Sequence, residues 1–152
     1  MPKHIVVPDE REAQLRQIAA KHNVTVAEAV GLLIGWAIEQ GKVPASIPTI
    51  DVRRVGNEVQ VDFGEFQRVM SLDLAKAFAT TLRWFSTTKV KGIPAAVTEL
   101  AQALSGSHLV GISRRGTSIK IAGENGRERT LAPSIARELA VLIERSAAGH
   151  PL

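Results

Sequence analysis

The chain has 152 residues, of which 45% are hydrophobic and 22% are charged, and this balance is typical of a globular protein and not of a disordered one. Cysteine is absent, which excludes disulfides and thiolate chemistry, and no apolar run is long enough for a membrane span or a signal peptide, so we expect a cytoplasmic protein without membrane association. The formal net charge of +4 is compatible with a nucleic-acid partner, and the excess lies entirely in residues 46–152, because residues 1–45 carry no net charge.

The first 45 residues predict one short strand followed by two helices, and the second helix is apolar on every side. From Ala29 to Ile38 the only polar side-chain group is the indole N–H of Trp36. A surface helix needs only one apolar stripe, and a segment of this length is too short to cover a helix that is apolar all round. We therefore expect the same segment of a second copy to provide the cover, in a homodimer or a higher homo-oligomer. The residues predicted to form this interface are Ile5, Val30, Leu33, Ile34 and Trp36.

The ends of these two helices carry local signals. Thr25 and Glu28 have the spacing of a capping box, in which the threonine hydroxyl accepts a hydrogen bond from the amide of Glu28 and the carboxylate accepts one from the amide of Thr25. Asn23 suits the left-handed residue that ends the first helix, and Gly41 suits the same position after the second. The two prolines of residues 42–48 then predict a linker.

Residues 46–152 contain an internal repeat, with copies at about 50–83 and 110–144. The strands of the two copies match at a constant offset of 60, and the helices match at 61 after a one-residue insertion where a turn is expected. We interpret this correspondence as a tandem duplication.

Each copy predicts a three-stranded meander followed by a helix. The first two strands meet at a glycine, Gly56 or Gly116, and the second and third strands meet at a tight turn. The helix carries apolar residues at i, i+4 and i+8, and Ser71 and Ser134 lie where a serine can cap its start. A further helix at about 94–104 is expected to join the two copies.

The N-terminal segment resembles the ribbon-helix-helix family of prokaryotic and phage DNA-binding proteins. The resemblance covers about 40 residues without a gap. It rests on Pro8 with the acidic residues after it, on the apolar positions of the first helix, and on the turn from Asn23 to Glu28. The predicted fold class is therefore α+β, with a ribbon-helix-helix dimerisation segment at residues 1–45 and a tandem-duplicated β-β-β-α domain at residues 46–152.

The resemblance implies that two strands pair across a homodimer and enter the major groove of double-stranded DNA. It places His4 and Val6 at base-reading positions and Lys3 toward the DNA backbone. It also implies that the amides at the start of the second helix hold a DNA phosphate, which favours the positive end of a helix. The DNA-binding residues that the resemblance implies are Lys3, His4, Val6, Thr25, Val26 and Ala27.

A second candidate surface lies in the duplicated part. Arginine pairs stand beside the matching hairpin turns of the two copies, and we expect equivalent positions to line one face that holds DNA phosphates without reading sequence. A solvated sheet face or a charge-protected sheet edge is the alternative interpretation. The candidate phosphate-binding residues are Arg53, Arg54, Arg114, Arg115 and Lys120.

No pattern in the sequence indicates catalysis. The four histidines lack metal-ligand spacing, no glycine-rich loop has a phosphate-binding context, and no carboxylates form a pair suited to acid–base chemistry. We therefore predict a protein that is not an enzyme and that uses no metal or cofactor. The preferred interpretation is a homodimeric, sequence-specific DNA-binding protein, either a transcriptional repressor or an accessory factor of a plasmid, phage or antitoxin system. Residues 46–152 would add phosphate contacts, mediate higher assembly or bind another protein.

Two alternatives remain. One is a protein-interaction or assembly module that uses the ribbon-helix-helix only to dimerise, and the neutral N-terminal segment favours it. The other is a helix-turn-helix formed by residues 14–37. The apolar second helix disfavours this reading, because a recognition helix offers polar side chains to a DNA groove.

Overall fold

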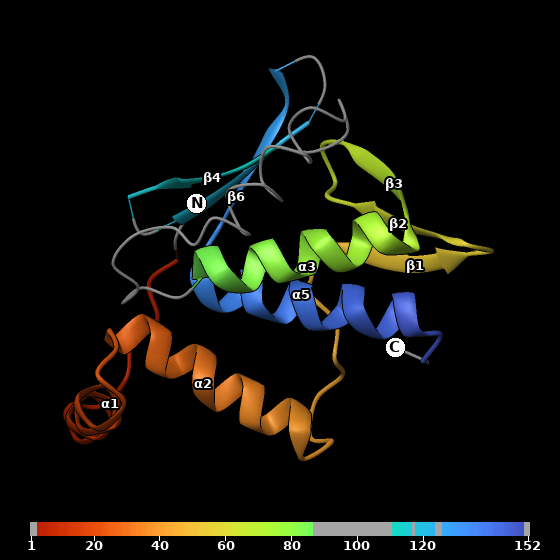
Figure 1. Ribbon diagram of the computed structural model, residues 1–152. Coiled ribbons are helices and arrows are strands. Elements are labelled where there is room, and N and C mark those ends of the chain that lie inside the picture. Colours follow the sequence, from red (N-terminus) through yellow and green to blue (C-terminus); the bar gives the residue numbers. More distant parts are fainter. Residues whose placement is uncertain (1–2, 87–110, 117, 124–125, 151–152) are drawn as a thin grey trace. The chain divides into compact units, whose positions relative to one another are not determined.

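The computed structural model describes residues 3–86, 111–116, 118–123 and 126–150, and the chain divides into two compact units, Met1–Pro44 and Ala45–Leu152 (Figure 1). Unit 1 contains helices α1 (Asp9–His22) and α2 (Val26–Glu39). Unit 2 contains two three-stranded antiparallel sheets together with helices, so the protein is of mixed α+β class. The helix predicted at about 94–104 lies outside the described residues. None of the helices in the described ranges has the length and apolar character needed to cross a bilayer.

Both helices of unit 1 end where the sequence predicts. Asn23 follows α1 with a left-handed backbone (φ 54°), and its amide donates to the carbonyl of Ala20 at 3.2 Å. Gly41 follows α2 with φ 69°, and its amide donates to the carbonyl of Ile38 at 3.0 Å. Asparagine and glycine tolerate this backbone conformation at the least cost, and both predicted helix ends are confirmed.

The segment predicted as an N-terminal strand, residues 3–7, is not paired in a sheet within one chain. Its apolar side chains are exposed, and Val6 is 96% exposed. A lone strand has no partners for its backbone N–H and C=O groups. Residues 3–7 therefore have no strand partner among the described residues of the chain.

Unit 2 repeats the predicted order of three strands and a helix. Each sheet is a meander with its strands in chain order. The first half consists of β1 (Asp51–Val55), β2 (Glu58–Asp62), β3 (Gln67–Ser71) and α3 (Leu72–Ser86), and the second of β4 (Gly111–Arg115), β5 (Ser118–Ala122), β6 (Glu128–Leu131) and α5 (Pro133–Ala148).

The strand registers of the two sheets correspond residue by residue. Val52 lies opposite Val61 in the first sheet, and Ile112 lies opposite Ile121 in the second, which is an offset of 60. The third strand of the second sheet is displaced by one further residue, so the insertion falls in the turn between β5 and β6. The glycines of the two first turns also share a φ of 61°. Matching registers show structural correspondence and not descent, so the duplication itself stays a prediction.

The two halves of unit 2 share one hydrophobic core. Helix α3 contacts β4 and β5 of the second half, and α5 contacts β1 and β2 of the first. The two helices lie side by side and run in opposite directions (Figure 1). Burial of a large apolar side chain contributes about 1.5–3 kcal/mol, so each half depends on the other for its stability. The fully buried centre of this core includes Phe63, Phe78, Leu82, Leu139 and Ile143.

The two helices of unit 2 begin differently. Oγ of Ser71 accepts a hydrogen bond from the amide of Leu74 at 3.2 Å, so the predicted cap of α3 is confirmed. The corresponding prediction for Ser134 is wrong, because α5 begins at Pro133 and its N-cap is Ala132, without a side-chain hydrogen bond. Proline suits the first helical position because the N–H that it lacks would have no acceptor in the helix.

An arginine from the first strand of each half binds the end of the other half's helix. Nη1 of Arg54 donates to the carbonyl of Ala147 at 3.0 Å, and Nη2 of Arg114 donates to the carbonyl of Phe85 at 2.5 Å. Arg54 and Arg114 occupy equivalent positions, so the two contacts repeat each other. The last carbonyls of a helix lack intrahelical donors and carry partial negative charge. These arginines therefore join the two halves through both helix ends.

Two arginines of the second half also donate hydrogen bonds to the first half, mainly at the turn between β2 and β3. Nη1 and Nη2 of Arg129 donate to the carbonyl of Phe63 at 3.0 Å and to Oγ1 of Thr49 at 2.9 Å. Arg127 donates to the carbonyl of Glu65 at 2.9 Å. Three hydrogen bonds from charged donors thus reinforce the contact between the halves.

We predict that Arg54→Ala lowers the free energy of unfolding by about 1–3 kcal/mol, because it removes a charged donor from a helix end. The control is Arg53→Ala, next to it in the strand, which removes only an exposed ion pair and changes stability by less than about 0.5 kcal/mol. Urea unfolding of the full chain measures both variants. Equal losses in the two variants would show that the helix-end contact contributes nothing specific.

Candidate nucleic-acid interface

Helix α2 carries an apolar surface that its own chain leaves uncovered. Val30, Leu33 and Ile34 are each at least one-third exposed, and Trp36 is 58% exposed. The first three share one helix face, since residues three and four apart are neighbours on a helix. Only one residue of each helix in unit 1 is buried, and it is an alanine in both. Unit 1 therefore lacks a core of its own.

The uncovered surface is wider than the predicted interface. Ile5 is exposed as predicted, and Val7, Leu32 and Val43 are exposed as well. Leu32 belongs to the run without polar side chains, so the sequence contained the signal for it. Val7 and Val43 lie outside any periodic pattern, and only the structure identifies them.

The start of α2 has the threonine half of the predicted capping box. Oγ1 of Thr25 accepts a hydrogen bond from the amide of Glu28 at 3.2 Å, and the carbonyl of Thr25 accepts one from the amide of Ala29 at 2.9 Å. No hydrogen bond recorded for the described residues uses the amides of Val26 and Ala27. Two N–H groups therefore remain available at the positive end of the helix, which is the arrangement that binds anions.

The other residues implied to contact DNA lie in the extended segment before α1. Lys3, His4 and Val6 are all exposed, and none of the described strands pairs with them. Unit 1 thus contains all six residues that the resemblance assigns to DNA, together with the exposed apolar surface.

The five candidate phosphate-binding residues of unit 2 do not form a single surface. Side chains alternate between the two faces of a strand, and Val52 of β1 is buried, so Arg54 lies on the core-facing side and Arg53 on the other. The same alternation separates Arg114 from Arg115 in β4. Arg54 and Arg114 are the two residues that bind helix ends.

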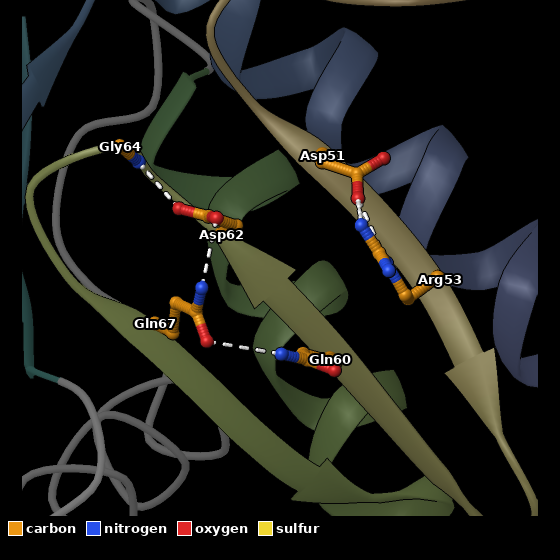
Figure 2. Close-up of polar contacts among 6 residues, drawn as sticks. All are labelled: Asp51, Arg53, Gln60, Asp62, Gly64 and Gln67. Carbon is orange, nitrogen blue, oxygen red and sulfur yellow. Dashed lines mark hydrogen bonds and ion pairs between the residues drawn. The ribbon is translucent and has the colours of Figure 1, made fainter.

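The remaining three cations pair with carboxylates. Arg53 forms an ion pair with Asp51 (Figure 2). Nζ of Lys120 and Nη1 of Arg115 lie 2.9 and 3.5 Å from the carboxylate oxygens of Glu128. The hydrogen bond from Lys120 holds the pKa of Glu128 below its usual value, against a desolvation that raises it, and the charges of both cations add to the lowering. This carboxylate thus competes with any phosphate for Lys120 and Arg115.

The outward face of the first sheet has a polar network of its own (Figure 2). Oδ1 of Asp62 accepts the amide of Gly64 at 2.8 Å, and Oδ2 accepts Nε2 of Gln67 at 2.9 Å. Oε1 of Gln67 in turn accepts Nε2 of Gln60 at 3.0 Å. These bonds tie β2 to β3. The charged side chains on this face are Asp51, Arg53, Glu58 and Asp62, so carboxylates dominate it and disfavour phosphate.

The comparisons with known proteins assign no family. No family model matches the sequence, and no curated protein or solved structure is significantly similar to it. Among the described residues, no group of three or more histidines, aspartates or glutamates is placed to hold a metal ion. The function therefore has to be argued from the geometry of unit 1 and from the placement of the cations in unit 2.

We predict that Thr25→Ala lowers the stability of α2 by about 1 kcal/mol, because it removes the side chain that accepts the amide of Glu28. Thr25→Ser is the matched control and keeps the hydroxyl. Thermal unfolding followed by far-ultraviolet circular dichroism compares the two variants with the natural chain. A loss of the same size in Thr25→Ser would mean that the methyl group matters and the cap does not.

Proposed function

We propose that this protein is a homodimeric, sequence-specific DNA-binding protein in which unit 1 both dimerises and contacts DNA. The observation that carries the proposal is the exposed apolar surface of α2. A helix with so much uncovered apolar area is a site of association and not a stable solvent-facing element. A second copy offers the same surface, and a two-fold dimer brings two such surfaces together.

The arrangement of unit 1 supports DNA as the ligand of such a dimer. The extended segment needs a second chain to pair with, and the antiparallel ribbon that would form has the width of a major groove. His4 and Val6 would then face the bases, Val6 through a thymine methyl group. The amides of Val26 and Ala27 would hold a phosphate beside the groove. These roles follow the resemblance to ribbon-helix-helix proteins.

In this proposal unit 2 does not supply the main phosphate contacts. Its core is complete, and each of the five candidate cations is engaged by an acceptor of its own chain. We infer that unit 2 mediates assembly or binds another protein, as expected of a repressor or an accessory factor of a plasmid, phage or antitoxin system.

A second candidate function is an assembly module that never contacts DNA. The pairing of the five candidate cations of unit 2 with acceptors of their own chain favours this function, as does the absence of net charge in residues 1–45. The two functions share the homodimer and differ only in whether the protein binds DNA. A DNA-binding measurement therefore distinguishes them.

We predict that Leu33→Glu converts the dimer into a monomer, because it places a charge in an apolar interface where it has no partner. Sedimentation equilibrium of the full chain measures the mass. Gln17→Glu, which adds the same charge at an exposed position of α1, is the control and leaves the mass unchanged. An unchanged mass for Leu33→Glu would remove α2 from the interface.

We predict that the protein binds duplex DNA with an affinity that falls steeply as salt rises, since phosphate contacts release counterions. Fluorescence anisotropy of labelled random duplex over a salt series measures this. A double variant, Lys3→Ala with His4→Ala, is expected to weaken binding. Arg115→Ala with Lys120→Ala is the control and leaves binding nearly unchanged, and it avoids the two arginines that bind helix ends. The absence of binding at the lowest salt would establish the assembly module instead.

A further inference from the structure

An ion pair between Arg83 of α3 and Glu144 of α5 joins the helices of the two halves of unit 2. Nε and Nη2 of Arg83 donate to Oε1 and Oε2 of Glu144 at 2.8 and 2.5 Å. Two parallel hydrogen bonds between a guanidinium and a carboxylate fix the orientation of both groups. This geometry distinguishes the pair from most surface ion pairs, which contribute little because their side chains stay mobile.

The two residues of this pair occupy equivalent positions in the two halves. The helices of the halves match at an offset of 61, and this is the offset between Arg83 and Glu144. Helices α3 and α5 lie side by side in opposite directions (Figure 1), and Arg54 and Arg114 make reciprocal contacts to the helix ends. The two halves are thus related by an approximate two-fold axis, and a residue beside such an axis faces its own equivalent.

The apolar residues of the two helices do not distinguish one half from the other. Phe78 and Leu82 of α3 correspond to Leu139 and Ile143 of α5, and all four are fully buried between the halves. Hydrophobic burial is non-directional and depends on area. An apolar face that accepts the unlike half is therefore also suited to the same half of another chain.

The charges at the self-facing position do distinguish the halves. Lys76 and Arg137 are also equivalent but have the same sign, and no other equivalent pair in these two helices carries a charge on both residues. If a first half paired with the first half of another chain, Arg83 would face a second Arg83. Two second halves would likewise bring two copies of Glu144 together. Like charges at this distance repel, and such repulsion disfavours a competing partner.

We propose that Arg83 and Glu144 make the pairing of the halves selective, so that each half accepts the unlike half and rejects another copy of itself. The partner that fits the apolar face of α3 is the second half, whose helix carries a carboxylate where α3 carries a guanidinium. The inference concerns unit 2 alone and depends on neither the homodimer nor the binding of DNA.

The first test is a charge-swap cycle on the full chain, followed by urea unfolding. We expect Arg83→Glu and Glu144→Arg each to raise the equilibrium constant of unfolding about threefold to tenfold, because each places like charges together. The double variant restores the ion pair with its signs exchanged and is expected to return the constant to within about twofold of the natural value. Lys76→Glu, the same charge change at an exposed position of α3, is the control and changes the constant less than about twofold. Effects that simply multiply in the double variant would overturn the proposal.

The second test measures the rejection of like halves. Arg83→Gln combined with Glu144→Gln removes both the attraction within a chain and the repulsion between like halves. This variant and the natural pair are both placed in the Leu33→Glu background, so that an interface at α2 does not contribute to the comparison. After refolding from urea at high protein concentration, size-exclusion chromatography is expected to show about threefold more oligomer for the neutral pair, the effect of one exposed ion pair. Equal amounts of oligomer would overturn the selectivity and leave the proposed function untouched.

Discussion

The uncovered apolar surface of α2 is the constraint on which the proposed function of this chain depends. In unit 2 the apolar helix faces are covered within one chain. Helices α3 and α5 pack on each other and on both sheets, and the largest apolar side chains of this core have no solvent exposure. Unit 1 cannot bury the apolar surface of α2 in this way, because one further helix and a short extended segment are too small to enclose it. Unit 2 buries its core within one chain, whereas unit 1 has no core of its own, and we propose that association supplies its cover.

The arginines of unit 2 show why a count of positive charges is a weak predictor of DNA binding. A guanidinium satisfies a carbonyl at a helix end as readily as it satisfies a phosphate, and the two core-facing arginines, Arg54 and Arg114, are used in this way. The outward cations face carboxylates at short range. The net charge of +4 therefore says little about any one surface, because the acceptors for these cations lie in the protein itself.

Local chemistry in the sequence predicts much of this fold. Asn23, Gly41 and Thr25 fix helix ends through their own backbone preferences and hydrogen bonds, which are local and do not depend on packing. The repeat offset also predicts the registers of the two sheets. The packing of each helix on the sheets of both halves was not predictable, because apolar periodicity says that a helix packs on a sheet but not on which one. The failure at Ser134 has a local origin, because the proline beside it offers a competing way to start the helix. For the candidate site, the run from Ala29 to Ile38 indicates an interface, but no periodic signal marks the strand as a base reader.

If unit 1 folds fully only as the proposed dimer, its stability depends on the concentration of the chain. In that dimer the extended segment would become a paired ribbon when two chains meet, and the two helix starts would lie on opposite sides of the two-fold axis. If DNA contacts come from both, the free monomer binds weakly, because it carries half of the phosphate contacts and no paired ribbon. Dimerisation and DNA binding then reinforce each other, since DNA that binds only the dimer shifts the monomer–dimer equilibrium by mass action. In this proposal unit 2, whose core forms within one chain, takes no part in the coupling.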